Sequence, residues 1–178
     1  MLNLSINKIS GIIPSCLMMM SNTLEVLNLK INSLSGPIPD TVSASCNLWT
    51  VNLNGNLLDG SISKSLANCL KLEELDLGSN QFIGSFPCFL KEISTLRILI
   101  LRNNKFQGSL ICLKTNKTWK MLQIVDIAFN NFSGKLPEKY FEVRYIMHNE
   151  AESKFIEKQF DGPIGNVYYQ DRVTVISK

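Results

Sequence analysis

Apolar and polar positions along this chain follow a frame that returns about every 24 residues. Within the frame, apolar residues recur as L-x-x-L-x-L, and an asparagine follows the last of them after two further residues. These asparagines are Asn7, Asn32, Asn56, Asn80, Asn104 and Asn130. Their separations are 25, 24, 24, 24 and 26 residues. The L-x-L alternation predicts short strands with one apolar side, at residues 26–30, 50–54, 74–78, 98–102 and 124–128.

The repetition predicts a stacked architecture. A single repeat cannot bury its apolar side alone, whereas stacked repeats share one continuous core. We expect the inward pairs, such as Leu27 with Leu29 and Leu75 with Leu77, to be almost fully buried. The recurring asparagine amide has donors and an acceptor for backbone groups that a turn exposes, so the asparagines should form a ladder.

The complete frame, L-x-x-L-x-L-x-x-N-x-L-x-G-x-I-P, resembles the leucine-rich repeat. It is seen as LEVLNLKINSLSGPIP from Leu24 and LEELDLGSNQFIGSFP from Leu72. The L-x-G-x-I-P ending is similar to the plant-specific extracellular subtype. The resemblance implies an α/β-type solenoid with parallel β-strands on its concave face, and with an additional strand and short helical turns on its convex side.

The sequence divides into two regions. Residues 1–137 hold about six repeats, of which the first is incomplete, whereas residues 138–178 show no repeat frame and form an irregular C-terminal tail. Residues 1–134 contain 11 basic and 8 acidic residues, and residues 135–178 contain 7 of each. This change in charge density indicates a non-repeat, island-like or linker segment.

The second region makes the resemblance more specific. The run LQIVDIAFNNFSGKLPEKYF, followed later by YYQDRVTVISK, resembles plant receptor-like proteins of the Verticillium-wilt-resistance class. In that class a non-repeat island precedes a few final repeats, a membrane helix and a short cytoplasmic tail. The resemblance implies that this chain is an internal fragment of a receptor ectodomain or a truncated gene product. It places the full-length protein at the extracellular side of the cell membrane, attached through a segment absent from this chain.

Composition and motifs exclude several functions. The net charge of +3 gives no electrostatic reason to expect nucleic acid binding. The sequence has neither a signal peptide nor an apolar run long enough for a membrane helix. Its one histidine, His148, has no neighbouring cysteine or acidic cluster, and no motif indicates a catalytic triad, a metal site or a cofactor site. We therefore expect a protein that is not an enzyme and that has neither a cofactor nor a metal.

The cysteine positions suggest two situations. Cys46 and Cys69 shortly precede the first leucine of the next repeat, where we expect buried free thiols. Cys88 and Cys112 lie 24 residues apart, one full repeat, and should be neighbours on adjacent rungs. The spacing of neighbouring strands suits a disulfide, while parallel Cβ directions oppose its closure. Both a bridge and two free thiols remain open for this pair.

Three N-x-[ST] sequons occur, at Asn3, Asn116 and Asn131. Asn116 and Asn131 are the expected glycan sites, because Asn3 lies on a predicted strand where neighbouring residues can mask it.

The predicted concave face carries an apolar patch on its last two strands. Exposed apolar side chains on successive rungs require either a covering segment or a binding partner. The tail covers this patch, or a partner binds there with Arg102 as a charged anchor. In plant receptors with an island, the island can help form the ligand site with nearby repeats. The expected ligand-binding residues are Ile98, Ile100, Arg102, Ile124, Asp126, Phe129, Tyr168 and Tyr169.

Together these features favour a ligand-recognition ectodomain fragment of a plant cell-surface receptor in immune or developmental signalling. It would bind a protein or peptide ligand, and a co-receptor kinase is a further expected partner. Two alternatives remain: a soluble cell-wall leucine-rich-repeat inhibitor of a pathogen enzyme, or a truncated product with no independent activity. The first alternative is disfavoured because such inhibitors end in a cysteine-paired cap, and residues 135–178 contain no cysteine.

Overall fold

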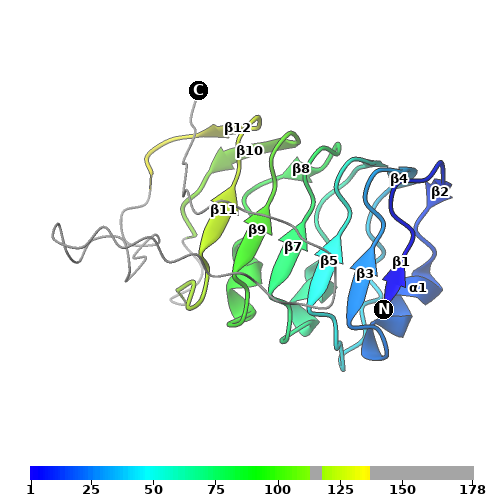
Figure 1. Cartoon of the computed structure of the whole chain (residues 1–178). Helices are drawn as coiled ribbons and strands as arrows, with labels where there is room; N and C mark the ends of the chain where they lie inside the picture. Colours follow the sequence, from blue (N-terminus) through cyan, green and yellow to red (C-terminus); the bar gives the residue numbers. More distant parts are fainter. Residues whose placement is uncertain (113–117, 137–178) are drawn as a thin grey trace, which may run out of the picture.

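The computed structural model describes residues 1–112 and 118–136. Within these residues, six strands form one parallel sheet in the order β1-β3-β5-β7-β9-β11, one strand from each repeat. They are β1 (Leu2–Asn3), β3 (Val26–Asn28), β5 (Thr50–Asn52), β7 (Glu74–Asp76), β9 (Ile98–Ile100) and β11 (Ile124–Asp126). The predicted leucine-rich-repeat solenoid with parallel strands is confirmed, and Figure 1 shows the strands side by side along the array.

Shorter elements complete each turn of the solenoid. In the described residues, the segments that follow the asparagine turns form two further parallel sheets of three strands each. Their strands are β2 (Ser10–Ile12), β4 (Ser33–Gly36), β6 (Leu57–Leu58), β8 (Ile83–Gly84), β10 (Lys105–Ser109) and β12 (Asn131–Ser133). The helical turns are α1 (Ser15–Met19), η1 (Met20–Asn22), η2 (Lys64–Asn68) and η3 (Cys88–Glu92). In Figure 1 these sheets lie at one end of the strands of the large sheet and the helices near the other.

The core runs through the middle of the stack. The inward pairs Leu75 with Leu77 and Leu99 with Leu101 have no exposed surface. On the last described strand, β11, the equivalent Val125 and Ile127 are only half-buried. This differs from the prediction of near-complete burial, because the described part of the large sheet ends at β11 and has a neighbouring rung on one side only.

The asparagine ladder is present in full. On each rung from the second onward, the asparagine Oδ1 accepts a hydrogen bond from a backbone N–H of the preceding rung, at distances of 2.9–3.1 Å. Its Nδ2 donates both to a carbonyl of the preceding rung and to carbonyls of its own turn. Buried backbone groups need such partners. The ladder therefore fixes the spacing and orientation of successive rungs.

Aromatic side chains fill the core near the last described repeats. Phe82, Phe106 and Phe132 occupy the same place in successive repeats, and their rings stack with centroids 6.3 and 6.1 Å apart. Phe86 meets both Phe132 and Trp119 edge to face. Offset-stacked and edge-to-face geometries are the favoured arrangements of aromatic rings. They give this end of the array a continuous packed interior.

Two disulfides join adjacent rungs in the described part of the chain. Cys88 is bonded to Cys112, the pair for which the sequence left two outcomes open. Cys46 is bonded to Cys69, so the prediction of free thiols at these positions was wrong, although both residues are buried. Their Cα atoms lie 4.7 Å apart on neighbouring rungs, which is within the range that a disulfide can span. Cys16 is a free, exposed thiol.

Candidate functional site

The concave face consists of the side chains that point away from the core on the large sheet. Strand register aligns them into rows that cross the strands. The first row contains Val26, Thr50, Glu74, Ile98 and Ile124. The second contains Asn28, Asn52, Asp76, Ile100 and Asp126. A ligand that crosses the strands would therefore meet one residue from each repeat in turn.

Most of the second row stabilises the ends of its own strands. A side-chain oxygen of Asn28, Asn52, Asp76 and Asp126 accepts a hydrogen bond from the backbone N–H two residues further on, at 3.0–3.2 Å. This is the local bond by which asparagine and aspartate favour turns. The carboxylates of Asp76 and Asp126 thus have a structural role at the strand ends.

Ile100 interrupts this row and is buried, with 6% of its surface exposed. The prediction that Ile100 is an exposed ligand contact is therefore wrong. Strands in a sheet lie about 4.8 Å apart, so side chains in the same row pack against one another. Ile100 lies between Asp76 and Asp126 in the row and packs between them. Its first-row neighbours Ile98 and Ile124 are partly exposed.

Arg102 is held by two contacts on this part of the face. Its guanidinium donates to the Asp126 Oδ2 at 3.1 Å, and it lies over the Phe129 ring, 5.6 Å from the ring centroid. Phe129 is itself 71% exposed. The structure thus brings together four of the predicted site residues, Arg102, Asp126, Phe129 and Ile124, on the last two described rungs.

An acidic pair lies next to this cluster on β7. Burial, reinforced by the charge of Asp76, raises the pKa of Glu74. Burial also raises the pKa of Asp76, against the opposing effect of hydrogen bonds from the Asn54 amide and the Gly78 N–H, both at 3.0 Å. A Cβ at Gly78 would come within 2.6 Å of the Asn54 Nδ2 atom. Gly78 therefore leaves room for the bond between Asn54 and Asp76.

Trp49 is not among the residues predicted from the sequence; it lies at the border of the concave face with 49% of its surface exposed. Backbone hydrogen bonds place it between two acidic residues: its N–H donates to the Glu25 carbonyl at 2.7 Å, and the Glu73 N–H donates to the Trp49 carbonyl at 2.8 Å. Both glutamates are exposed. The signal that could have revealed Trp49 is its place directly after Leu48, at a solvent-facing position of the frame.

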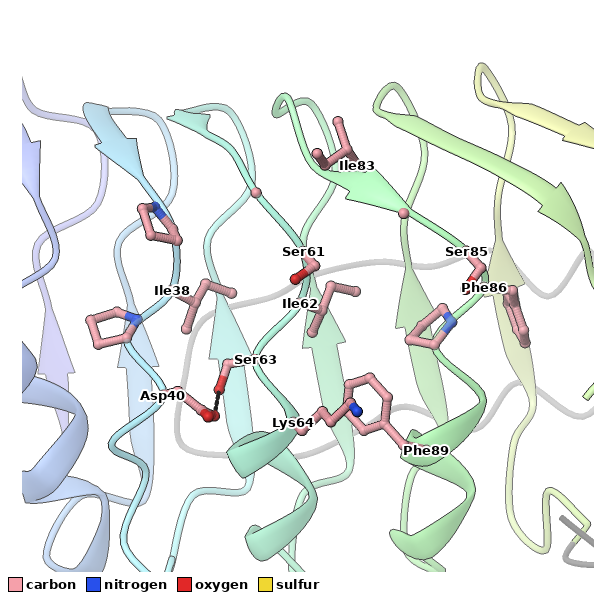
Figure 2. Close-up of a pocket in the computed structure, with 15 residues that line it drawn as sticks. Ile38, Asp40, Ser61, Ile62, Ser63, Lys64, Ile83, Ser85, Phe86 and Phe89 are labelled. Carbon is pink, nitrogen blue, oxygen red and sulfur yellow. Dashed lines mark hydrogen bonds between the residues drawn. The ribbon is translucent and has the colours of Figure 1, made fainter. Parts of the chain in front are cut away.

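A groove of about 770 Å³ lies away from the concave face. Figure 2 shows its lining side chains on the segments of three successive repeats that lead into the helical turns. Most are apolar, including Ile38, Ile62 and Phe86. The Ser63 hydroxyl donates to the Asp40 carboxylate at 2.6 Å, and this bond is the main cause that lowers the pKa of Asp40. The groove combines an apolar floor with one ionised, hydrogen-bonded carboxylate.

The remaining predicted positions are distributed as follows. Tyr168, Tyr169 and Asn116 lie outside the described residues. Asn131 is exposed on β12, and Asn3 is exposed on β1 with its Oδ1 accepting the Ser5 N–H at 3.1 Å. Within the described ranges, no helix is long and apolar enough to cross a membrane. In the same ranges no group of three or more potential ligands could hold a metal ion.

Comparisons with known proteins agree with this geometry. Residues 71–93 match the family model described as Leucine Rich Repeat. No curated protein matches the sequence. Among solved structures, the Arabidopsis thaliana BIR3–SERK2 complex contains a chain that is 32% identical, with a TM-score of 0.63; the match covers 75% of this chain and 69% of that one.

Two larger solved receptors from Arabidopsis are also similar. The ectodomain of the receptor kinase GASSHO1/SCHENGEN3, in complex with CASPARIAN STRIP INTEGRITY FACTOR 2, is 39% identical with a TM-score of 0.69, over 76% of this chain and 16% of that one. The receptor kinase HAESA, in complex with the peptide hormone IDA and the co-receptor SERK1, is 31% identical with a TM-score of 0.69, over 76% and 22%. This chain belongs to the leucine-rich-repeat family, and its solved relatives are plant receptor proteins.

Proposed function

We propose that this chain is a ligand-recognition part of a plant cell-surface receptor ectodomain in immune or developmental signalling, of the Verticillium-wilt-resistance class. It recognises a protein or peptide, performs no catalysis, and acts on the extracellular side of the cell membrane together with a co-receptor kinase. The observation that carries the proposal is the cluster of Arg102, Asp126 and Phe129 on the concave face. HAESA, a solved relative, is a receptor seen with a peptide hormone and a co-receptor.

The cluster has properties that suit ligand binding. Asp126 and Phe129 hold the Arg102 side chain in one orientation, so less conformational entropy is lost when a ligand contacts it. The partly exposed Ile98 and Ile124 provide apolar surface beside it. Exposed aromatic and arginine side chains commonly dominate the binding energy of protein interfaces. These residues can therefore anchor a ligand without any rearrangement of the rungs.

The test uses the full-length receptor with Phe129→Ser and Arg102→Ala. We expect loss of ligand response and of co-receptor association at normal surface abundance. Lys105→Ala is the matched control, because Lys105 is also exposed and basic but contacts Gln81 on the other side of the turn. If both variants signal normally, the ligand site lies elsewhere on the protein.

A further inference from the structure

On the concave face, a basic side chain of the chain itself is held by an aromatic ring and a carboxylate. Arg102 lies over the Phe129 ring at 5.6 Å and contacts the Asp126 carboxylate at 3.1 Å. An aromatic face and a carboxylate act in the same direction, because the ring quadrupole and the negative charge both attract a positive group. The occupied arrangement therefore consists of an aromatic ring and a carboxylate on one rung and a basic side chain on the preceding rung.

Trp49 presents the same two components on the central rungs. It is the residue that follows the first leucine of its repeat, and Glu25 and Glu73 hold the same position in the repeats on either side. The backbone bonds of 2.7 and 2.8 Å between these residues keep them one rung apart. The three side chains thus lie in one row, with an exposed indole in the middle and an exposed carboxylate on each flank.

Two basic groups close to this row already have partners, and one of those partners is Glu73 of the row itself. The Lys71 Nζ donates to the Asn47 Oδ1 at 2.9 Å. Arg97 lies 3.6 Å from the Glu73 carboxylate, on the side of Glu73 that is away from Trp49 in the rung order. Within residues 1–112 and 118–136, the contacts between cations and rings are those of Lys91 with Trp119 and of Arg102 with Phe129. The Trp49 ring takes part in neither of these two contacts.

We infer that Trp49, flanked by Glu25 and Glu73, binds the side chain of an arginine or lysine in an extended peptide partner. This inference rests on the proposed function and specifies the chemistry of its ligand. Tryptophan provides the strongest cation–π attraction of the aromatic side chains. Glu73 is already paired with Arg97, so the Glu25 carboxylate supplies most of the charge complementarity, which favours a basic over a neutral or acidic partner. The row lies beside the first row, because Trp49 directly precedes Thr50. A peptide that contacts Trp49 can therefore pass onto the first row toward Ile98 and Ile124.

The test measures whether charge on the peptide matters at Trp49. In the full chain with Trp119→Phe, Trp49 is the remaining tryptophan, since the sequence has 2. Its fluorescence is followed during titration with acetyl-Gly-Arg-Gly-Arg-Gly-amide and with the citrulline analogue, which keeps the shape and removes the charge. We expect a saturable change with the arginine peptide and about tenfold weaker binding of the citrulline peptide.

Substitutions test whether the difference in affinity between the two peptides depends on Glu25, Trp49 and Glu73. Glu25→Gln with Glu73→Gln should reduce the preference for arginine, whereas Asp59→Asn, an exposed acid outside the row, should leave it unchanged. By calorimetry, Trp49→Ala should abolish binding and Trp49→Tyr should retain most of it, with unchanged circular dichroism for both. Equal affinity for the two peptides, or an equal effect of Asp59→Asn, would overturn the inference. If it fails while the Arg102 and Phe129 variants still lose signalling, the proposed function stands. If those variants also signal normally, the proposed ligand site on this face fails as well.

Discussion

The Nδ2 atom of Asn80 donates a hydrogen bond to the backbone carbonyl of Leu53, one rung earlier in the array, at 3.0 Å. The same nitrogen also donates to the carbonyls of Leu77 and Gly78 on its own rung. The Asn80 Oδ1 accepts a hydrogen bond from the buried Leu58 N–H at 3.1 Å. One side chain thus satisfies backbone groups of two successive rungs. Because these groups are away from water, they have no alternative partner when the amide is removed.

We predict that Asn80→Ala lowers the free energy of unfolding by about 2–4 kcal/mol, since each orphaned buried polar group costs roughly 1–3 kcal/mol. Urea denaturation followed by circular dichroism measures this. Asn7→Ala is the matched control: Asn7 is exposed and its amide bonds only to Leu4 and Ser5 of its own rung. That variant should lose about 1 kcal/mol or less. Equal losses in the two variants would mean that the contacts between rungs add nothing.

Asp76→Asn should stabilise the protein at neutral pH. Asn28 and Asn52 hold the equivalent place on earlier rungs and accept the same backbone bond, so an amide fits there. Burial raises the pKa of Asp76 in the folded state. The folded state therefore resists ionisation, and the protein loses stability as the pH rises from below 3.8, the ordinary value, through the raised pKa.

The asparagine variant lacks this titration. Its advantage in urea midpoint over the parent should be present at pH 7 and should shrink as the pH falls toward 3.8. Asp59→Asn provides a control for the loss of an exposed carboxylate. An advantage of Asp76→Asn that is the same at every pH would show that burial of the charge is not its cause.

The sequence predicted those features of the fold that recur in every repeat. The strands, the buried leucines and the asparagine ladder each depend on a position that returns six times, so one rule describes all copies. The burial of Ile100 was not predictable in this way. It depends on lateral neighbours from other repeats, Asp76 and Asp126.

The candidate site and the cysteines were likewise predictable only where the repeat frame applies. Arg102, Ile124, Asp126 and Phe129 could be placed together because the register of the repeats puts them on adjacent rungs. The pairing of Cys46 with Cys69 was missed because each thiol was assigned to the interior of its own repeat. Their separation of 23 residues, one less than the usual period, also hid that they are neighbours. Interactions between irregular positions can be identified only from the three-dimensional structure, whereas interactions between repeated positions can be predicted from the repeat frame.

The disulfide between Cys46 and Cys69 should contribute substantially to stability. It closes a loop over a separation of 23 residues, for which loss of chain entropy in the unfolded state gives about 3 kcal/mol. We predict that Cys46→Ala with Cys69→Ala lowers the free energy of unfolding by about this amount, measured by urea denaturation. Cys16→Ala should have little effect, because Cys16 is a free, exposed thiol. A non-reducing peptide map that shows Cys46 or Cys69 unpaired in secreted material would contradict the assignment.

Asn131 should carry an N-glycan when the chain is secreted from plant cells. Asn131 and Ser133 of its sequon are both exposed on β12, in one of the small sheets and outside the concave face. The Asn3 side chain instead accepts the N–H of Ser5 in its own sequon, and Asn3 shares a row with Asn28 on the concave face. A glycan at Asn131 would therefore leave the binding rows open, whereas one at Asn3 would cover them.

We predict that Asn131→Gln removes the mass of one glycan from the intact secreted protein and leaves binding of the arginine peptide unchanged. Asn3→Gln should leave the mass unaltered apart from the substitution itself. Intact-mass measurements before and after glycosidase treatment distinguish these outcomes, because an occupied sequon gains a large polar group at the surface. Absence of a glycan from Asn131 in material shown to have passed through the secretory pathway would contradict this prediction. It would leave the repeat fold, which depends on the leucines and the asparagine ladder, unaffected.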